Sequence, residues 1–192
     1  MIIGIDFDNT LVDYTGVFHR VAVDLGWIPA SVRPDKTSVR DYLRGKGGEE
    51  LWIELQGLVY GPHIFSAQPF PGATDFLRYC RQKGMDFFII SHKTRFPFLG
   101  KKHDLHDYAL QWLGRNGIGA DRAYFELTKE DKLSRIAGLK SDYFVDDLPE
   151  FLTEPRFPAQ VQRILFDPHQ NHESNPLYQR VASWEECWRL VA

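Results

Sequence analysis

Residues 1–14, MIIGIDFDNTLVDY, contain an apolar run with two carboxylates placed at its end. The run Ile2–Phe7 has the residue types of a strand that is buried in a core, and Asp6 and Asp8 interrupt and follow it. Residues i and i+2 of a strand point to the same side, so the two negative charges are expected next to each other at the edge of the core. Such an arrangement costs free energy unless a positive charge compensates it. The stretch therefore predicts a compensating cation at the end of this strand.

Length and composition predict one folded domain, or one domain with a lid. The chain has 192 residues, of which 43% are hydrophobic and 14% aromatic, so a sizeable core can form and disorder is not expected. The net charge of −3 gives no electrostatic argument for binding a nucleic-acid polymer or a membrane surface. No apolar run reaches the about 18 residues of a membrane span, and no leader-like segment precedes the first strand. We expect a soluble cytoplasmic protein in which Cys80 and Cys187 are reduced thiols, with no indication of its oligomeric state.

Strand-like and helix-like segments alternate along most of the chain. The expected strands are Ile2–Phe7, Met85–Ile90, Ala123–Phe125, Tyr143–Val145 and Ile164–Phe166. The segments Ala73–Lys83 and Asp104–Asn116 have apolar residues at helical spacing and are each followed by a glycine. Ser183 with Glu186 has the spacing of a capping box that opens a last helix. This order predicts an α/β fold, a Rossmann-like parallel sheet with helices on both faces.

The stretch 13–70 departs from this alternation. It contains two helical patterns, Val17–Leu25 and Glu49–Tyr60, which are joined by a polar, glycine-containing connection and followed by a proline-rich segment. An insertion that leaves after the first strand suggests a cap over the carboxyl edge of the sheet, where open parallel sheets bind ligands. We therefore expect a core domain formed by residues 1–12 and 71–192, and a small, mainly helical cap formed by residues 13–70.

Polar side chains lie at the C-terminal ends of the expected strands or, for Lys132, at the start of a nearby helix. Since neighbouring parallel strands end at the same edge, residues distant in sequence are expected to share one pocket there. The pocket would hold four carboxylates, one hydroxyl and one ammonium, from Asp6, Asp8, Ser91, Lys132, Asp146 and Asp147. Carboxylate oxygens are ligands that suit Mg²⁺, and with metal and phosphate bound a carboxylate can attack phosphorus.

Four short motifs in this order resemble the haloacid dehalogenase superfamily of phosphohydrolases. The family's first motif, Asp-x-Asp-x-Thr after an apolar strand, is matched by DFDNT at residues 6–10. The second, a Ser or Thr that ends a strand, is matched by Ser91 in IISHKT, and the third, a Lys at the start of a helix, by Lys132. The fourth, acidic residues after a strand, is matched by Asp146 and Asp147 in YFVDD. Each motif alone is weak, but four in order over nearly the whole chain are specific.

The resemblance assigns catalytic roles to residues of these motifs. It implies that Asp6 is the nucleophile and that Asp8 protonates the leaving alcohol and then activates the hydrolytic water. It also implies that Ser91 forms a hydrogen bond with the transferring phosphoryl group and that Lys132 neutralises the charge developing there. Lys129 is a weaker candidate for the third motif, because Lys132 better precedes the apolar residues of its helix.

The resemblance also implies a bound Mg²⁺ ion. Its ligands would be Asp6, the backbone carbonyl of Asp8, and Asp146, while Asp147 would reach the ion through water. Asp146 and Asp147 could exchange these two roles. The short interval between Lys132 and Asp146 resembles the nucleotidase-like branches of the family.

Side chains near the motifs are candidates for substrate binding, together with Ser91. Thr10 ends the first motif, and His92, Lys93 and Arg95 could line the mouth of the pocket and meet an anionic group of the substrate. The three basic residues could instead belong to a solvated loop. Other basic side chains are expected to face solvent, namely His103 and His106, one helical turn apart, and most of Arg33, Lys36, Arg40 and Arg44 in the cap.

Together these features predict a Mg²⁺-dependent phosphohydrolase that cleaves a small phosphomonoester through an aspartyl-phosphate intermediate. A nucleoside monophosphate, a sugar phosphate and a polyol phosphate all fit a small capped pocket. A dehalogenase is disfavoured, because that branch does not keep the second Asp of the first motif and Asp8 is present. A phosphonatase using Lys36 or Lys46, a phosphomutase, and a binding or regulatory module without useful turnover are the alternatives.

Overall fold

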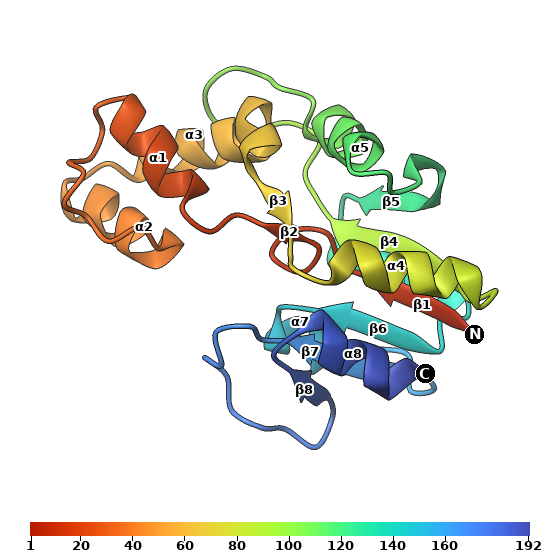
Figure 1. Cartoon of the computed structure of the whole chain (residues 1–192). Coiled ribbons are helices and arrows are strands. Elements are labelled where there is room, and N and C mark those ends of the chain that lie inside the picture. Colours follow the sequence, from red (N-terminus) through yellow and green to blue (C-terminus); the bar gives the residue numbers. More distant parts are fainter.

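The computed structural model describes residues 1–192 and contains a six-stranded parallel sheet in the order β5-β4-β1-β6-β7-β8 (Figure 1). Its strands are β1 (Ile2–Ile5), β4 (Asp86–His92), β5 (Ala123–Glu126), β6 (Tyr143–Asp146), β7 (Gln162–Phe166) and β8 (Gln179–Val181). All neighbouring pairs are parallel, as expected for apolar strands separated by helices. The expected α/β fold is confirmed. The additional strand β8 has only one apolar residue and therefore gave no signal in the sequence.

Helices cover both faces of this sheet, because successive strand residues point to opposite sides. The helices of this part are α4 (Ala73–Gln82), α5 (Leu105–Arg115), α6 (Lys129–Gly138), α7 (Pro149–Leu152) and α8 (Trp184–Val191), with a 3₁₀ turn, η2 (Ala120–Arg122). In β4, Ile89 packs in the large cluster of buried residues that includes those of α4, α5 and α8. Its neighbour Ile90 packs in a second cluster with residues of α6 and α7. The two clusters therefore lie on opposite faces of the sheet.

Local chemistry decides where several helices begin and end. Asp104, Thr128 and Ser183 precede α5, α6 and α8, and each side chain accepts hydrogen bonds from backbone amides of the first turn. Gly84 and Gly117 lie shortly after α4 and α5 with φ of 68° each, in the left-handed region that glycine adopts at little steric cost. The helix ends expected from Gly84, Gly117 and Ser183 are confirmed.

The insert after β1 lies between two short antiparallel strands (Figure 1). These strands are β2 (Val12–Asp13) and β3 (Gln68–Pro69). Between them lie α1 (Val17–Asp24), α2 (Lys36–Gly45), α3 (Glu49–Tyr60) and the 3₁₀ helix η1 (Pro62–Ser66). Helices α1 and α3 match the two helical patterns expected in this stretch.

Helix α2 corrects the expectation of a polar connection between the other two helices. Asp35 begins it by accepting a hydrogen bond from the Ser38 amide at 2.7 Å. Val39 and Leu43, four residues apart, are buried among the helices of the insert. A stripe of two apolar residues among many charged ones is too short to identify a helix from the sequence.

The first strand ends at Ile5 rather than at Phe7. The chain turns sharply after it, and Asn9 has a φ of 59°, which is left-handed and uncommon for a residue other than glycine. Because the strand ends early, its alternation does not extend to Asp6 and Asp8. Each of these carboxylates can therefore have its own surroundings.

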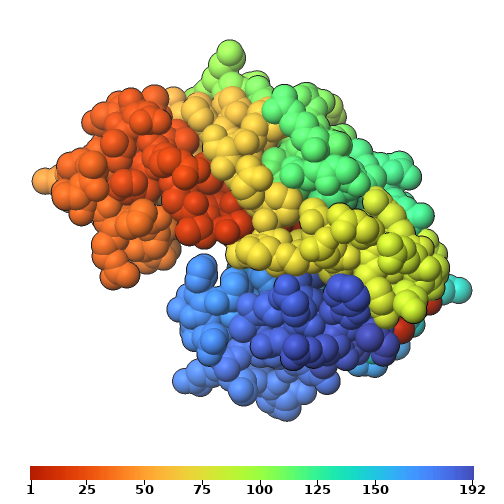
Figure 2. Space-filling model, in the orientation of Figure 1, coloured from red at the N-terminus to blue at the C-terminus, as the bar shows by residue number.

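The insert is packed against the rest of the chain as well as joined to it by β2 and β3. Buried residues of the insert and of the sheet belong to one continuous cluster. The space-filling view shows a notch between the insert, coloured red to orange, and the C-terminal part, coloured blue (Figure 2).

None of the helices combines the length and the apolarity that crossing a membrane requires.

Candidate active site

The sheet topology brings the first and fourth motifs together. Asp6 follows β1, and Asp146 ends β6, the strand that pairs with β1. The Asp6 amide donates a hydrogen bond to the Val145 carbonyl at 2.8 Å. The chain runs from β1 outward to β4 and β5, and it then returns to the other side of β1 at β6. This reversal is the switch point at which open α/β sheets bind ligands.

The positive charge that compensates Asp6 is a lysine. Lys132, near the start of α6, places its Nζ 2.6 Å from Asp6 Oδ1 and 2.6 Å from Asp146 Oδ2. All three side chains are buried, and the centroid of the Phe151 ring lies 4.1 Å from Nζ. Two carboxylates and one ammonium thus form a buried group of ions with an excess of one negative charge.

Asp8 has a separate set of partners. Lys93 Nζ donates to both of its carboxylate oxygens, at 2.7 and 3.0 Å, and the Tyr14 hydroxyl donates to Oδ1 at 2.7 Å. Lys93 is buried, and its Nζ lies 4.8 Å from the centroid of the Tyr60 ring at the end of α3. No sequence motif marks Tyr14 or Tyr60, because both reach this site only through the packing of the insert.

Burial dominates the acid–base properties of the acidic cluster. Burial raises the pKa of Asp6; Lys132 opposes this, Asp146 adds to it, and the result is about 7. Burial, and then the charges of Asp146 and Asp6, raise the pKa of Asp147 well above its ordinary value. Burial lowers the pKa of Lys132, but Asp146 and Asp6 outweigh this, so the net shift is upward and the ammonium stays charged. The cluster therefore needs further positive charge, or a proton, near neutral pH.

Asp6, Asp146 and Asp147 form a group that fits a metal ion. One carboxylate oxygen from each lies within 4.8 Å of the others. The Leu148 amide donates to Asp146 Oδ1 at 2.9 Å, and Thr10 Oγ1 donates to Asp147 Oδ1 at 3.3 Å, so backbone and hydroxyl groups orient two of the three acids. Clustered hard oxygen donors suit Mg²⁺, whose charge would also compensate the carboxylates.

The raised pKa of Asp6 predicts a pH-dependent stability of the metal-free protein. The folded state keeps this proton up to about pH 7, whereas the unfolded chain releases it near the ordinary value for Asp. The stabilising contribution is thus present at about pH 4 and is lost as the pH rises through about 7. In EDTA we expect Asp6→Asn to gain stability relative to the wild type over this range, by up to about 1.4 kcal/mol per pH unit. Urea unfolding at about pH 4, 6 and 8 measures this difference, and a constant difference would contradict the expectation.

Ser91 and Thr10 lie at the same edge of the sheet. Ser91 is buried in β4, two residues beyond the Ile5–Ile89 pair that aligns β4 with β1. Its hydroxyl makes no hydrogen bond within the chain, so it can donate one to a ligand. Thr10 is buried and contacts the acidic cluster through Asp147.

His92 and Arg95 are not brought to the carboxylates. His92 is exposed, and its Nε2 lies 3.1 Å from the carbonyl oxygen of Leu127, on the β5 side of β4. Arg95 is exposed and forms an ion pair with Asp104 at 3.0 Å. Of the three predicted residues His92, Lys93 and Arg95, it is Lys93 that contacts a carboxylate of the site.

Several basic residues expected at the solvent-facing surface have partners inside the structure. His106 is half-buried, and its Nε2 lies 2.8 Å from the Lys93 carbonyl oxygen, so the expectation of an exposed position is wrong. His103 is also half-buried and precedes α5 instead of lying on it. Lys36, unlike Arg33, Arg40 and Arg44 of the same insert, donates to the Tyr60 hydroxyl, at 2.8 Å. These contacts depend on how α5 and the insert pack, which the local sequence does not indicate.

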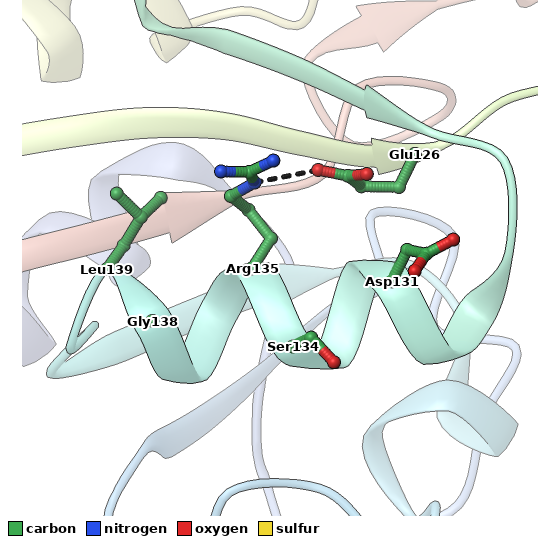
Figure 3. Close-up of a pocket in the computed structure, with 6 residues that line it drawn as sticks. All are labelled: Glu126, Asp131, Ser134, Arg135, Gly138 and Leu139. Atoms are coloured by element: carbon green, nitrogen blue, oxygen red, sulfur yellow. Dashed lines mark hydrogen bonds and ion pairs between the residues drawn. The ribbon is translucent and has the colours of Figure 1, made fainter.

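A separate hollow lies against α6 (Figure 3). Its lining residues are Glu126, Asp131, Ser134, Arg135, Gly138 and Leu139. Arg135 extends across it toward Glu126, with which it forms an ion pair at 2.7 Å. None of the carboxylates around Lys132 borders this hollow, so we assign it no part in the chemistry.

Two curated proteins are similar to this chain over almost its full length. A "Putative nucleotidase" of Bacillus cereus is 24% identical over 202 residues, covering 98% of this chain and 96% of that protein. A "Putative 5'(3')-deoxyribonucleotidase" of Chlorobaculum tepidum is 24% identical over 197 residues, covering 100% of this chain and 90% of that protein. No protein-family model matches the sequence.

Solved structures show the same architecture. A HAD family hydrolase from Deinococcus radiodurans with bound phosphate and sodium has a TM-score of 0.61 and 14% identity, covering 100% of this chain and 94% of its own. The "putative HAD-hydrolase YfnB" of Bacillus subtilis, bound to magnesium, has a TM-score of 0.56 and 13% identity, covering 99% and 97%. The chain therefore has the fold of the haloacid dehalogenase superfamily of hydrolases, which confirms, for the fold, the resemblance expected from its motifs.

Proposed function

We propose that the protein is a Mg²⁺-dependent phosphohydrolase acting on a small phosphomonoester. The observation that carries this proposal is the buried arrangement in which Lys132 joins Asp6 to Asp146, beside Asp147. It combines a carboxylate nucleophile, an ammonium for phosphoryl oxygens and an oxygen site for a divalent ion. The phosphate and magnesium in the structures of similar fold, and the names of the two curated relatives, support the same class of reaction.

In the proposed reaction the Asp6 carboxylate attacks phosphorus. The bond from Asp6 to phosphorus forms while the bond from phosphorus to the leaving oxygen breaks, and Asp8 gives that oxygen its proton. In the second half, Asp8 takes a proton from a water molecule whose oxygen attacks phosphorus, releasing inorganic phosphate and the free Asp6 carboxylate. Lys93 and Tyr14 hold the Asp8 side chain in one orientation for both steps.

The metal ion would be held by Asp6 and Asp146, with Asp147 directly or through water and the Asp8 backbone carbonyl as a further ligand. When bound, it supplies positive charge to the phosphoryl oxygens. The acids themselves are kept in place by the chain, since Asp146 accepts from a backbone amide and Asp147 from the Thr10 hydroxyl.

Ser91 and Lys132 are proposed to bind the phosphoryl group. Phosphoryl transfer has a loose transition state with charge on the equatorial oxygens, so positioned donors supply much of the catalysis. Lys132 approaches from α6, and the Ser91 hydroxyl from β4, on the other side of β1 from Asp146.

We also propose that residues 13–70 act as a cap over the core formed by the rest of the chain. Two insert residues support this role, because Tyr14 donates to Asp8 and the ring of Tyr60 covers the Lys93 ammonium. An insert at this position would exclude large substrates, so that only small ones reach the site, and it would reduce the amount of water near the reacting groups.

Among small phosphomonoesters, a nucleotide is the substrate that we favour. The names of both curated relatives support it, since one is described as a nucleotidase and the other as a deoxyribonucleotidase. The aromatic side chains Phe18 and Trp52 are buried in the core of the insert. Tyr60 is half-buried beside Lys93, so it is the aromatic residue placed to contact a substrate.

The test is release of inorganic phosphate from a panel of nucleotides, sugar phosphates and polyol phosphates, with Mg²⁺ or with EDTA. We expect turnover of at least one ester, and a loss of about 100-fold or more in EDTA that added Mg²⁺ reverses. Equal turnover by the metal-stripped protein would contradict the role of the ion. A folded, Mg²⁺-loaded protein that hydrolyses no ester of a broad panel would contradict the phosphohydrolase proposal.

A further inference from the structure

Lys36 is a half-buried ammonium of the insert whose hydrogen-bond and ring partners are neutral. Its Nζ donates to the Tyr60 hydroxyl at 2.8 Å and lies 5.2 and 5.6 Å from the ring centroids of Phe18 and Tyr60. Lys93 and Lys132, by contrast, are each joined to carboxylates at 2.7 Å or less. Lys36 forms no such ion pair, so it is the lysine near the site whose charge is not taken up by a carboxylate partner.

The local sequence does not force Lys36 into this position. It is the first residue of α2, and nearby Arg33 shows that a basic side chain here can extend into water, with 85% of its side chain exposed. Partial removal of an ammonium from water costs free energy that a phenol and two rings offset only in part. Burial lowers the pKa of Lys36, but Tyr60, and then Asp8 and Asp147, raise it above its ordinary value, so the side chain stays charged. A charged group held in this way is suited to receive an anion.

Tyr60 connects Lys36 to the Asp8 end of the site. Besides Lys36, the Tyr60 ring contacts Lys93 Nζ, at 4.8 Å, and the Tyr14 ring, at 5.1 Å between centroids. Lys93 and Tyr14 are the two residues that hold Asp8. If Asp8 protonates the leaving oxygen, as the proposed function requires, Lys36 lies on the side of the leaving group rather than on that of the nucleophile.

We propose that Lys36, positioned by Tyr60, binds a second anionic group of the substrate, a carboxylate or phosphate carried by the leaving alcohol. This inference rests on the proposed phosphohydrolase function and extends it to substrate specificity. Lys93 is held on Asp8, and Lys132 lies between Asp6 and Asp146, where it is proposed to meet the scissile phosphoryl group, so neither is placed to bind a second anion. A nucleotide with a second phosphate meets the requirement, and so does a phosphorylated hydroxy acid.

The test compares two esters that differ in one group. In 3-phosphoglycerate a carboxylate replaces the terminal hydroxymethyl group of glycerol 3-phosphate. We expect the wild type to prefer 3-phosphoglycerate by about tenfold in kcat/KM, mainly through KM, since a hydrogen bond to a charged group has about this effect. Lys36→Met is expected to reduce the preference to within about twofold, and Lys36→Arg to retain part of it.

Lys46→Met is the matched control, because Lys46 lies exposed at the other end of α2 and has no ion pair. It is expected to keep the wild-type preference. Tyr60→Phe, which removes the hydroxyl that holds Lys36, should weaken the preference without abolishing it. If the ratio of kcat/KM for the two esters is unchanged in Lys36→Met, the proposal is overturned. If, in addition, kcat/KM falls equally for both esters, that result would place Lys36 on the scissile phosphoryl group instead.

A binding measurement separates failure of this inference from failure of the proposed function. Calorimetric titration of Asp6→Asn with each ester in Mg²⁺ requires no turnover. About tenfold tighter binding of 3-phosphoglycerate, lost in the Asp6→Asn, Lys36→Met double variant, would support the anion site even if the wild type hydrolysed neither ester. Equal binding of the two esters would overturn the anion site even if the wild type hydrolysed both.

Discussion

Asp6→Asn is expected to abolish phosphate release, lowering kcat by at least about 10⁴-fold. The amide has nearly the volume of the carboxylate but is a far weaker nucleophile, so the bond to phosphorus does not form. An amide oxygen can still accept a hydrogen bond from Lys132, and the ammonium keeps its second partner Asp146, so the fold is expected to persist. Phosphate release under saturating substrate and Mg²⁺ measures the effect.

Asp24→Asn is the matched control for this experiment. Asp24 is an exposed residue at the end of α1 and has no hydrogen-bond or ion-pair partner in the chain. Its replacement should leave turnover within about twofold of the wild type. Turnover by Asp6→Asn at more than a few per cent of the wild-type rate would assign the nucleophile to another group.

Lys132→Met is expected to reduce stability and activity together. The substitution leaves Asp6 and Asp146 buried without the ammonium that lies 2.6 Å from each of them. Breaking a buried ionic group by removing one partner costs about 3–5 kcal/mol. Urea unfolding in EDTA near pH 8, above the pKa of about 7 of Asp6, should show the largest loss.

Mg²⁺ should restore part of this stability, because the cation compensates the same carboxylates. Activity should remain low even with the ion, since the ammonium that meets the phosphoryl oxygens is still missing. Lys129→Met, which changes an exposed lysine in the same turn of α6, is expected to be close to the wild type in both measurements. A Lys132→Met protein as stable as the Lys129→Met protein would refute the structural role of the buried ions.

The order of the fold and the identity of its acidic residues could be predicted from the sequence. Apolar strand runs that alternate with helical patterns predict a parallel sheet, and residues placed after such strands must converge on its carboxyl edge. Asp6, Lys132 and Asp146 are found together for this reason, although 126 residues separate the first two. Helix α2 and strand β8 were not predicted, because each has too few apolar residues to stand out from its polar neighbours.

The sequence alone determined that acids, a lysine and a serine lie at one edge of an α/β sheet. The tertiary structure decided which charges meet, pairing Asp8 with Lys93 and Tyr14, turning His92 away, and holding Lys36 on Tyr60. These pairings depend on the turn that ends β1 and on how the insert packs, so they join residues through contacts that no local pattern records. Apolar periodicity is a property of neighbouring residues, whereas an ion pair across 85 residues is a property of the assembled fold.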